Sequence, residues 1–240
     1  MQSQLFPISI KGILQHKGKY LLRKNERKEW ELLGGKLEAN ETIESRLITE
    51  FLEESGIRVI MTKHAEPWLY TIGIREVLIL PYHCEPIHIP SKLHDQDGGE
   101  LAWFTLDEIH KLPMPKGYLD SILGKIPQAS FSVTDKQQSA VVTQGFKVLV
   151  STLIENENGE VLVHDKHDNL LPSIFLEPHY TPRIALKRLL RQLGVSANTL
   201  IHSLPSRVTN DEVCISYYLV DQDISAMNGY KMIKNTELKL

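Results

Sequence analysis

The segment from Gly35 to Ile57, GKLEANETIESRLITEFLEESGI, constrains the fold of this chain more than any other. The pair Gly34-Gly35, at which it begins, is typical of a tight turn, and Gly56 near its end is typical of a helix stop. Together they predict a helix from about Thr42 to Ser55. An α-helix turns about 100° per residue, so three glutamates of this helix fall within about one third of its circumference. These are Glu50, Glu53 and Glu54, whereas Ile43, Leu47, Phe51 and Leu52 form a separate apolar face.

The three glutamates place like charges three and four residues apart, which destabilises a helix by about 0.2–0.5 kcal/mol per pair. A divalent cation would remove this conflict. Mg²⁺ and Mn²⁺ prefer carboxylate, carbonyl and water oxygens, and they commonly share substrate phosphates. A solvated acidic helix face is the alternative interpretation. The glycines at both ends and the apolar face on the other side favour the metal site.

The segment resembles the Nudix box, written G-x5-E-x7-R-E-U-x-E-E-x-G-U, where U is a bulky aliphatic or aromatic residue. Every defined position matches except one, because Thr49 replaces the arginine. The resemblance implies an α/β fold, the Nudix α/β/α sandwich with a mixed sheet. It also implies a MutT-like pyrophosphohydrolase that uses Mg²⁺ or Mn²⁺. Its expected reaction is hydrolysis of a diphosphate bond in a nucleoside diphosphate linked to another group.

The resemblance also assigns roles to particular residues. Glu53 and Glu54 match metal ligands, Glu50 matches a residue that serves as ligand or base, and the Gly35 carbonyl matches a backbone ligand. A further glutamate outside the box is a family feature, and Glu100, just before a Trp-containing strand, fits that description. It is interpreted either as a base or extra ligand, or as a loop charge.

Three other residues are candidates for the substrate side of the site. Arg46 lies one turn before Glu50 and either replaces the missing arginine as an orienting cation or forms an ordinary surface pair. Glu38 either reaches the metal site or is a solvated loop acid. Trp68 either stacks on a nucleotide base or belongs to the core, as most strand aromatics do.

Hydrophobic patterning divides the chain into a Nudix domain at 1–128, a linker at 129–145 and a second domain at 146–240. The linker is rich in Gln, Ser, Thr and Lys. In the first domain we expect strands at Ile8–Leu14, Tyr20–Arg23, Trp30–Leu33, Arg58–Thr62, Pro67–Ile74, Arg75–Cys84 and Leu101–Phe104, and short helices at Leu106–Leu112 and Tyr118–Leu123.

The second domain is interpreted as a degenerate, truncated Nudix-like copy of the first. The segment 158–195 follows the order of turn glycines, strands and helix found in 18–57. In this alignment Ser173 stands at the Gly35 position and His179 at the Glu41 position. The metal-binding glutamates are replaced by Arg188, Arg191 and Gln192, which cannot supply anionic oxygens. We therefore expect this domain to be catalytically silent and to support the first by packing or by dimerisation.

Composition narrows the choice of partner. The net charge of −3 gives no general attraction to nucleic acid, so we expect a small nucleotide substrate, with a homodimer possible. Two cysteines far apart predict neither a disulfide framework nor a zinc site. No segment looks like a signal peptide or a membrane span, and we expect a cytoplasmic protein. The competing function is a non-catalytic nucleotide-sensing regulator built on a Nudix-like domain, in which loss of the box arginine would be tolerated.

Overall fold

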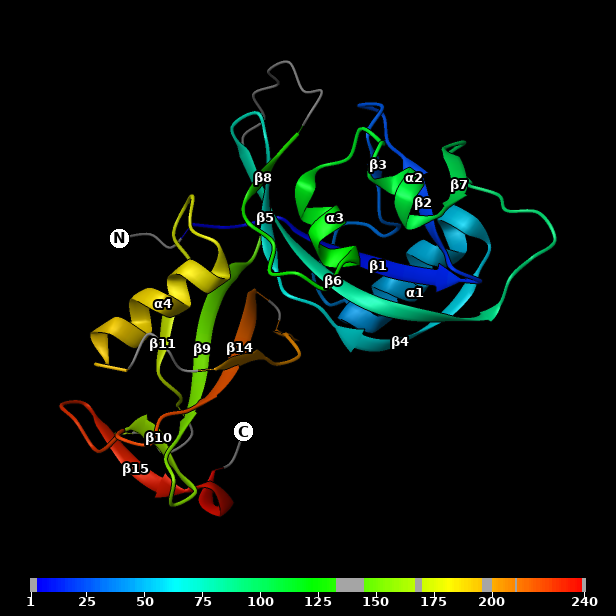
Figure 1. The fold of residues 1–240 in the computed structure, drawn as a ribbon. Coiled ribbons are helices and arrows are strands. Elements are labelled where there is room, and N and C mark those ends of the chain that lie inside the picture. The colour runs from blue at the N-terminus through cyan, green and yellow to red at the C-terminus, as the bar shows by residue number, and fades with distance from the viewer. Residues whose placement is uncertain (1–3, 133–144, 167–169, 196–199, 210, 239–240) are drawn as a thin grey trace. The chain divides into compact units, whose positions relative to one another are not determined.

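The computed structural model describes residues 4–132, 145–166, 170–195, 200–209 and 211–238. It contains two compact units (Figure 1). The first unit is built mainly from Leu5–Phe146, and the second unit mainly from Lys147–Arg207 and Glu212–Leu240. Within the described residues, no helix has the length and apolar character needed to cross a membrane.

The first unit has a mixed sheet, as the sequence predicted. Its central strand, β1, runs parallel to β6 and antiparallel to β2. On one side β2 pairs with β3 and β7, and on the other β6 pairs with β4 and β5. The strands are β1 (Ile8–His16), β2 (Lys19–Lys24), β3 (Trp30–Glu31), β4 (Arg58–His64), β5 (Trp68–Ile72), β6 (Arg75–His88) and β7 (Glu100–Phe104).

Helices cover both faces of this sheet and complete the α/β/α sandwich (Figure 1). On one face α1 (Ile43–Ser55) packs on β1 and β4, and the ring of Phe51 lies so close to Gly12 that a Cβ there would be 2.1 Å from it. On the other face lie α2 (Leu106–Ile109) and α3 (Lys116–Ile122). There Tyr118 packs edge-on against Trp68, with ring centroids 5.0 Å apart. The Nudix-type fold class predicted from the sequence is confirmed.

A short strand, β8 (Ser130–Phe131), lies inside the predicted linker and pairs with β5. The first residues of that polar segment therefore belong to the first sheet. Residues 133–144, the rest of the predicted linker up to Gly145, lie outside the described part of the chain.

The second unit repeats the connectivity of the first. Its central strand, β9 (Lys147–Glu155), runs parallel to β14 (Glu212–Val220), as β1 does to β6. Next to β9 lies β10 (Glu160–His164), which pairs with β15 (Tyr230–Lys234) as β2 pairs with β7. The remaining elements are β11 (Ser173–Phe175), α4 (Pro182–Gln192), β12 (Ile201–Ser203), β13 (Arg207–Val208) and the 3₁₀ helix η1 (Asn235–Glu237).

Backbone hydrogen bonds define how the two units correspond, residue by residue. In the first unit the Gly12 N–H donates to the Leu33 carbonyl (2.9 Å), and in the second the Thr152 N–H donates to the Pro172 carbonyl (3.0 Å). Four residues after Leu33, the Leu37 N–H donates to the Ile8 carbonyl of β1 (2.9 Å). Four residues after Pro172, the Leu176 N–H donates to the Val148 carbonyl of β9 (2.8 Å). Helix α1 then begins after the N-cap Thr42, and α4 after the N-cap Thr181.

This register moves the alignment made from the sequence by one residue. Ile174, not Ser173, stands at the Gly35 position, and Tyr180, not His179, stands at the Glu41 position. The partners of the three glutamates Glu50, Glu53 and Glu54 are Leu189, Gln192 and Leu193 in place of Arg188, Arg191 and Gln192. The sequence alignment matched Gly56 with Gly194, but Thr181 lies one residue closer to Gly194 than Thr42 lies to Gly56.

Candidate active site

Helix α1 presents the three glutamates from its last two turns. It begins with a capping box in which Thr42 and Ser45 bond each other's backbone N–H groups, and it ends at Gly56 in the left-handed conformation. Both ends of the helix are thereby determined by local sequence. Glu50 and Glu54 are only 8% and 7% exposed, whereas Glu53 is exposed to solvent.

Glu54 is held against the turn that precedes the box loop. Its carboxylate accepts a hydrogen bond of 2.8 Å from the Gly34 N–H and lies 3.3 Å from the Arg23 Nε. Burial raises the pKa of Glu54 to about 7, although nearby Lys11, the Gly34 bond and Arg23 all act in the opposite direction. The cations already present therefore leave this buried carboxylate incompletely neutralised.

Glu50 lies beside the Gly35 backbone, where only glycine leaves space for it. A Cβ at Gly35 would be 1.9 Å from the Glu50 Oε1. Burial raises the pKa of Glu50, and the charge of Arg46 opposes this shift. Arg46 forms a close ion pair with Glu50 and lies 3.6 Å from the Glu41 carboxylate.

Arg46 thus bridges Glu41 and Glu50, the first glutamate of the box and the first of the cluster. The resemblance gives this bridging position to the box arginine, whose place is taken here by Thr49. Thr49 is exposed. Arg46, three residues earlier on the helix, supplies the guanidinium instead. Its side chain is more than half-buried.

Three residues near the carboxylates were not identified from the sequence: Lys11, Arg23 and Asp95. The Lys11 Nζ donates to the Gly34 carbonyl (2.6 Å) and lies 3.3 Å from Glu31, while Arg23 donates to buried Asp95 at 2.6 Å. A lysine within the apolar run ISIKGIL was a usable signal for Lys11. Asp95 lies in a polar loop that gave none.

The donor set suits a hard divalent cation, since carboxylate and carbonyl oxygens are the ligands that Mg²⁺ prefers. The raised pKa values of Glu50 and Glu54 also fit a site that lacks positive charge. However, among the described residues no three acidic, His or Cys side chains are placed to hold an ion. Glu50 is paired with Arg46, and Glu54 with Gly34 and Arg23, so a bound cation would use the lone pairs of these carboxylates that the protein partners leave free.

The other predicted residues lie around this cluster or away from it. Glu38 is exposed and pairs with Lys36 at 3.0 Å. Glu100, at the start of β7, is exposed and pairs with Lys24 at 3.1 Å. Trp68 is fully buried in the core beneath α3, so no nucleotide base can stack on it in this conformation.

A polar cleft of about 640 Å³ opens beside the carboxylates. Arg23 lines it and also contacts Glu54, so the cleft and the carboxylate cluster share this residue. The other charged residues that line it are Lys24, Glu26, Lys28, Asp97 and Glu100. The cleft therefore offers cationic groups for phosphates directly next to the metal-type ligands.

Comparison with known proteins identifies the family. The family model described as "NUDIX domain" matches residues 10–122. A "MutT-like protein" from Streptomyces ambofaciens is 30% identical over 107 residues, which cover 44% of this chain and 68% of that protein. The "Uncharacterized Nudix hydrolase YvcI" of Bacillus subtilis (strain 168) is 26% identical over 111 residues, 44% of this chain and 70% of that protein.

Solved structures also resemble the chain. The solution structure of the E. coli ORF135 protein aligns with a TM-score of 0.44 and 20% identity, covering 50% of this chain and 89% of that protein. The box, the mixed sheet between helices, the family model and the Streptomyces relative agree. The chain belongs to the Nudix family, and the matched residues lie in its first unit.

Proposed function

We propose that the first unit uses Mg²⁺ or Mn²⁺ to hydrolyse the diphosphate bond of a nucleoside diphosphate linked to another group. One observation carries this proposal: two buried carboxylates, Glu50 and Glu54, lie against the Gly34-Gly35 backbone with their pKa values raised by burial. Burying two neighbouring carboxylates costs stability unless a cation compensates their charge. A divalent ion explains why both are retained.

The residues proposed to hold the ion are Glu50, Glu53, Glu54 and the Gly35 carbonyl. When bound, such a cation activates water and neutralises the leaving diphosphate. Arg46 is proposed to orient Glu50, since it already bridges that carboxylate and Glu41. Lys11 holds the Gly34 carbonyl and thereby the turn that carries Gly35.

The polar cleft is proposed to bind the substrate phosphates. It is lined by three cationic side chains, Arg23, Lys24 and Lys28. Their N–H groups can donate hydrogen bonds to phosphate oxygens. Glu100 also lines this cleft, and we propose it as a base or an extra ligand at the edge of the site. Glu38 remains a candidate only if the box loop moves, because it is exposed and paired with Lys36.

A non-catalytic nucleotide-sensing regulator is the second candidate. The observation that favours it is the engagement of Glu50 and Glu54 by protein groups, with no cation-holding cluster among the described residues. A protein that only senses nucleotides needs the cleft to bind them, but it does not need the three carboxylates to be available for a metal ion.

An assay of phosphate and mononucleotide release over a panel of nucleoside diphosphate derivatives separates the two functions. The full chain should release product only with Mg²⁺ or Mn²⁺, and Glu53→Gln should abolish release. Glu44→Gln is the matched control, because Glu44 is an exposed glutamate in the first turn of the same helix. Nucleotide binding without turnover on any substrate, together with a metal-independent gel shift of genomic DNA, would support the regulator instead.

The second unit is proposed to lack catalysis, because Leu189, Gln192 and Leu193 occupy the ligand positions. A supporting role by packing or homodimer formation, and a cytoplasmic location, remain predictions. Both cysteines, Cys84 and Cys214, are free, which fits a reducing compartment.

A further inference from the structure

One face of the second sheet has no helix over it among the described residues. On the other face, α4 covers the strands, with the Arg183 guanidinium 5.5 Å from the Tyr217 ring centroid. Side chains alternate along a strand, so Cys214 and Ser216 point away from α4. In the first unit the matching face is buried under α2 and α3. In the described part of the second unit, β15 is followed by the short η1.

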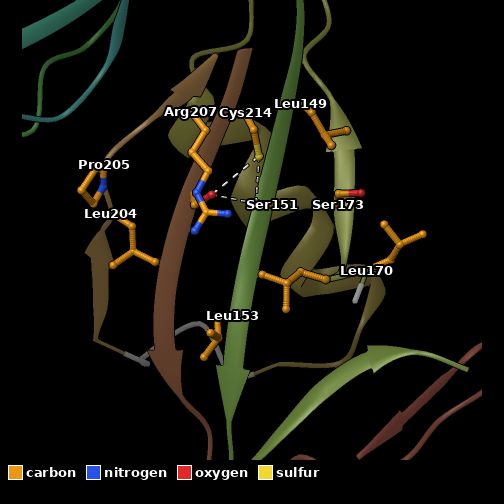
Figure 2. A pocket seen from close by; sticks show the side chains of 11 residues that line it. Leu149, Ser151, Leu153, Leu170, Ser173, Leu204, Pro205, Arg207 and Cys214 are labelled. Carbon is orange, nitrogen blue, oxygen red and sulfur yellow. Dashed lines mark hydrogen bonds between the residues drawn. The ribbon is translucent and has the colours of Figure 1, made fainter. Parts of the chain in front are cut away.

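A cavity of about 390 Å³ lies on this uncovered face (Figure 2). Its volume falls within the range of about 300–1,000 Å³ that small-molecule sites occupy. Most of its lining is aliphatic and comes from β9 and from the segments before β11 and β13: Leu149, Leu153, Leu170, Leu171, Leu204 and Pro205. These side chains fit the apolar body of a ligand.

Three polar groups lie together on the floor of this cavity. The Ser151 Oγ is 3.0 Å from the Ser216 Oγ and 3.3 Å from the Cys214 Sγ. Ser151 is only 5% exposed. A hydroxyl carries one donor and two acceptor positions, so the two serines keep hydrogen-bonding capacity beyond their mutual bond. A ligand with a polar end can use that capacity.

Arg207, from β13, supplies a positive charge over the same floor. Figure 2 shows its side chain reaching toward Ser151. The Arg207 side chain forms no ion pair or hydrogen bond with any residue in the described part of the chain. A guanidinium with free donors above an apolar cavity is complementary to a carboxylate, which it can bind through two parallel hydrogen bonds.

We propose that this cavity binds a small organic anion, an aliphatic carboxylate whose chain lies among the leucines and whose carboxylate pairs with Arg207 above Ser151 and Ser216. None of the residues that line the cavity belongs to the proposed hydrolytic site. The cavity gives the unit without catalytic glutamates a ligand-binding role of its own.

Calorimetric titration of the full chain tests the proposal with three probes: octanoate, its neutral counterpart 1-octanol, and acetate, which has the charge without the chain. Octanoate should bind at least about tenfold more tightly than octanol, because a charge-assisted pair contributes about that factor. It should also bind at least about tenfold more tightly than acetate, because each buried CH₂ group contributes about 0.8 kcal/mol. Arg207→Gln should remove the advantage over octanol. Arg188→Gln, an exposed arginine on α4, is the matched control and should retain it.

Thiol alkylation gives a second measurement that needs no variant. Cys214 lines the cavity, so saturating octanoate should slow its reaction with iodoacetamide at least several-fold. Buried Cys84, whose pKa burial raises to about 12, is the internal control and should stay unmodified with or without ligand. Equal affinity for octanoate and octanol, unchanged affinity in Arg207→Gln, or a face covered by a second copy of the chain in solution would overturn the proposal.

Discussion

Helices α1 and α4 occupy equivalent places in two sheets of the same connectivity, yet they bury opposite kinds of side chain. Where α1 buries Glu50 and Glu54, α4 buries Leu189, and its C-cap Leu193 is buried as well. Leucine at such a position gains about 1.5–3 kcal/mol from burial, whereas a buried carboxylate costs free energy. The raised pKa of Glu54 records that cost. The fold therefore does not need glutamates there, which supports the proposal that Glu50 and Glu54 of α1 bind the cation.

The arginine of the box is present in the second unit, whereas the first unit lacks it. The second unit keeps Arg188 at the box arginine position, paired with Glu177 at 2.8 Å, but has no carboxylates for it to orient. The first unit keeps the carboxylates and supplies the guanidinium from Arg46 instead. Four substitutions test how far this comparison holds, and they follow in order of decreasing effect.

The largest effect is expected from Leu189→Glu. This substitution removes a buried leucine and places a charge among apolar side chains. It should therefore lower the free energy of unfolding of the second unit by about 3–5 kcal/mol. Arg191→Glu is the control, since Arg191 is exposed and should change stability by less than about 0.5 kcal/mol. Urea unfolding measures both. Similar losses in the two variants would show that the one-residue shift in alignment is wrong.

Glu53→Gln should lower kcat at least about 100-fold, equivalent to about 2.7 kcal/mol, because removing even a partner of a metal ligand commonly costs 10–100-fold. The exposed position of Glu53 means that the fold should be unaffected. Steady-state kinetics and a thermal melt measure the two effects. An unchanged kcat would remove Glu53 from the site.

Arg46→Ala should lower kcat by about 10–100-fold, because Glu50 loses the cation that orients it. Thr49→Arg alone should give little gain, since Arg46 already bridges Glu41 and Glu50. Kinetics of the double variant sharpen the test, because an arginine at 49 should restore part of the loss. A large gain from Thr49→Arg in the presence of Arg46 would show that the native bridge is inadequate.

Gly35→Ala should have the smallest effect, about a fivefold to tenfold fall in kcat. The new Cβ would lie 1.9 Å from the Glu50 Oε1 and would push that carboxylate from its place, a misplacement of a functional group that costs rate. Ile174→Ala, at the equivalent position of the second unit, should leave kcat unchanged. Equal rates for wild type and Gly35→Ala would mean that the carboxylate can relocate freely.

Much of the first unit could be predicted because its signals are local. The box helix was expected over Thr42–Ser55 and spans Ile43–Ser55 with Thr42 as its N-cap, since a capping box and a left-handed glycine are set by neighbouring residues. The expected strand at Ile8–Leu14 extends to His16, and that at Arg75–Cys84 extends to His88, because pairing with neighbouring strands prolongs them beyond their apolar core.

The rest depended on contacts between distant residues. Asp95 joins the site through Arg23, 72 residues away in sequence, and periodicity gives no information about such a pair. The two faces of β5 could not be told apart from its residues, so the burial of Trp68 beneath α3 became evident only once α3 was placed. The sequence alignment of the two units was wrong by one residue because it matched Gly56 with Gly194, although the spacing from the N-cap threonine to that glycine is one residue shorter in the second unit.

The central claim is that the first unit holds the divalent cation and the second cannot. Calorimetric titration of the full chain with Mn²⁺ tests it directly, beside Glu50→Gln/Glu53→Gln/Glu54→Gln and, as control, Gln192→Ala in the second unit. Mn²⁺ should bind the wild type and the control alike and should not bind the triple variant. Undiminished Mn²⁺ binding by the triple variant, or its loss in Gln192→Ala, would contradict the claim.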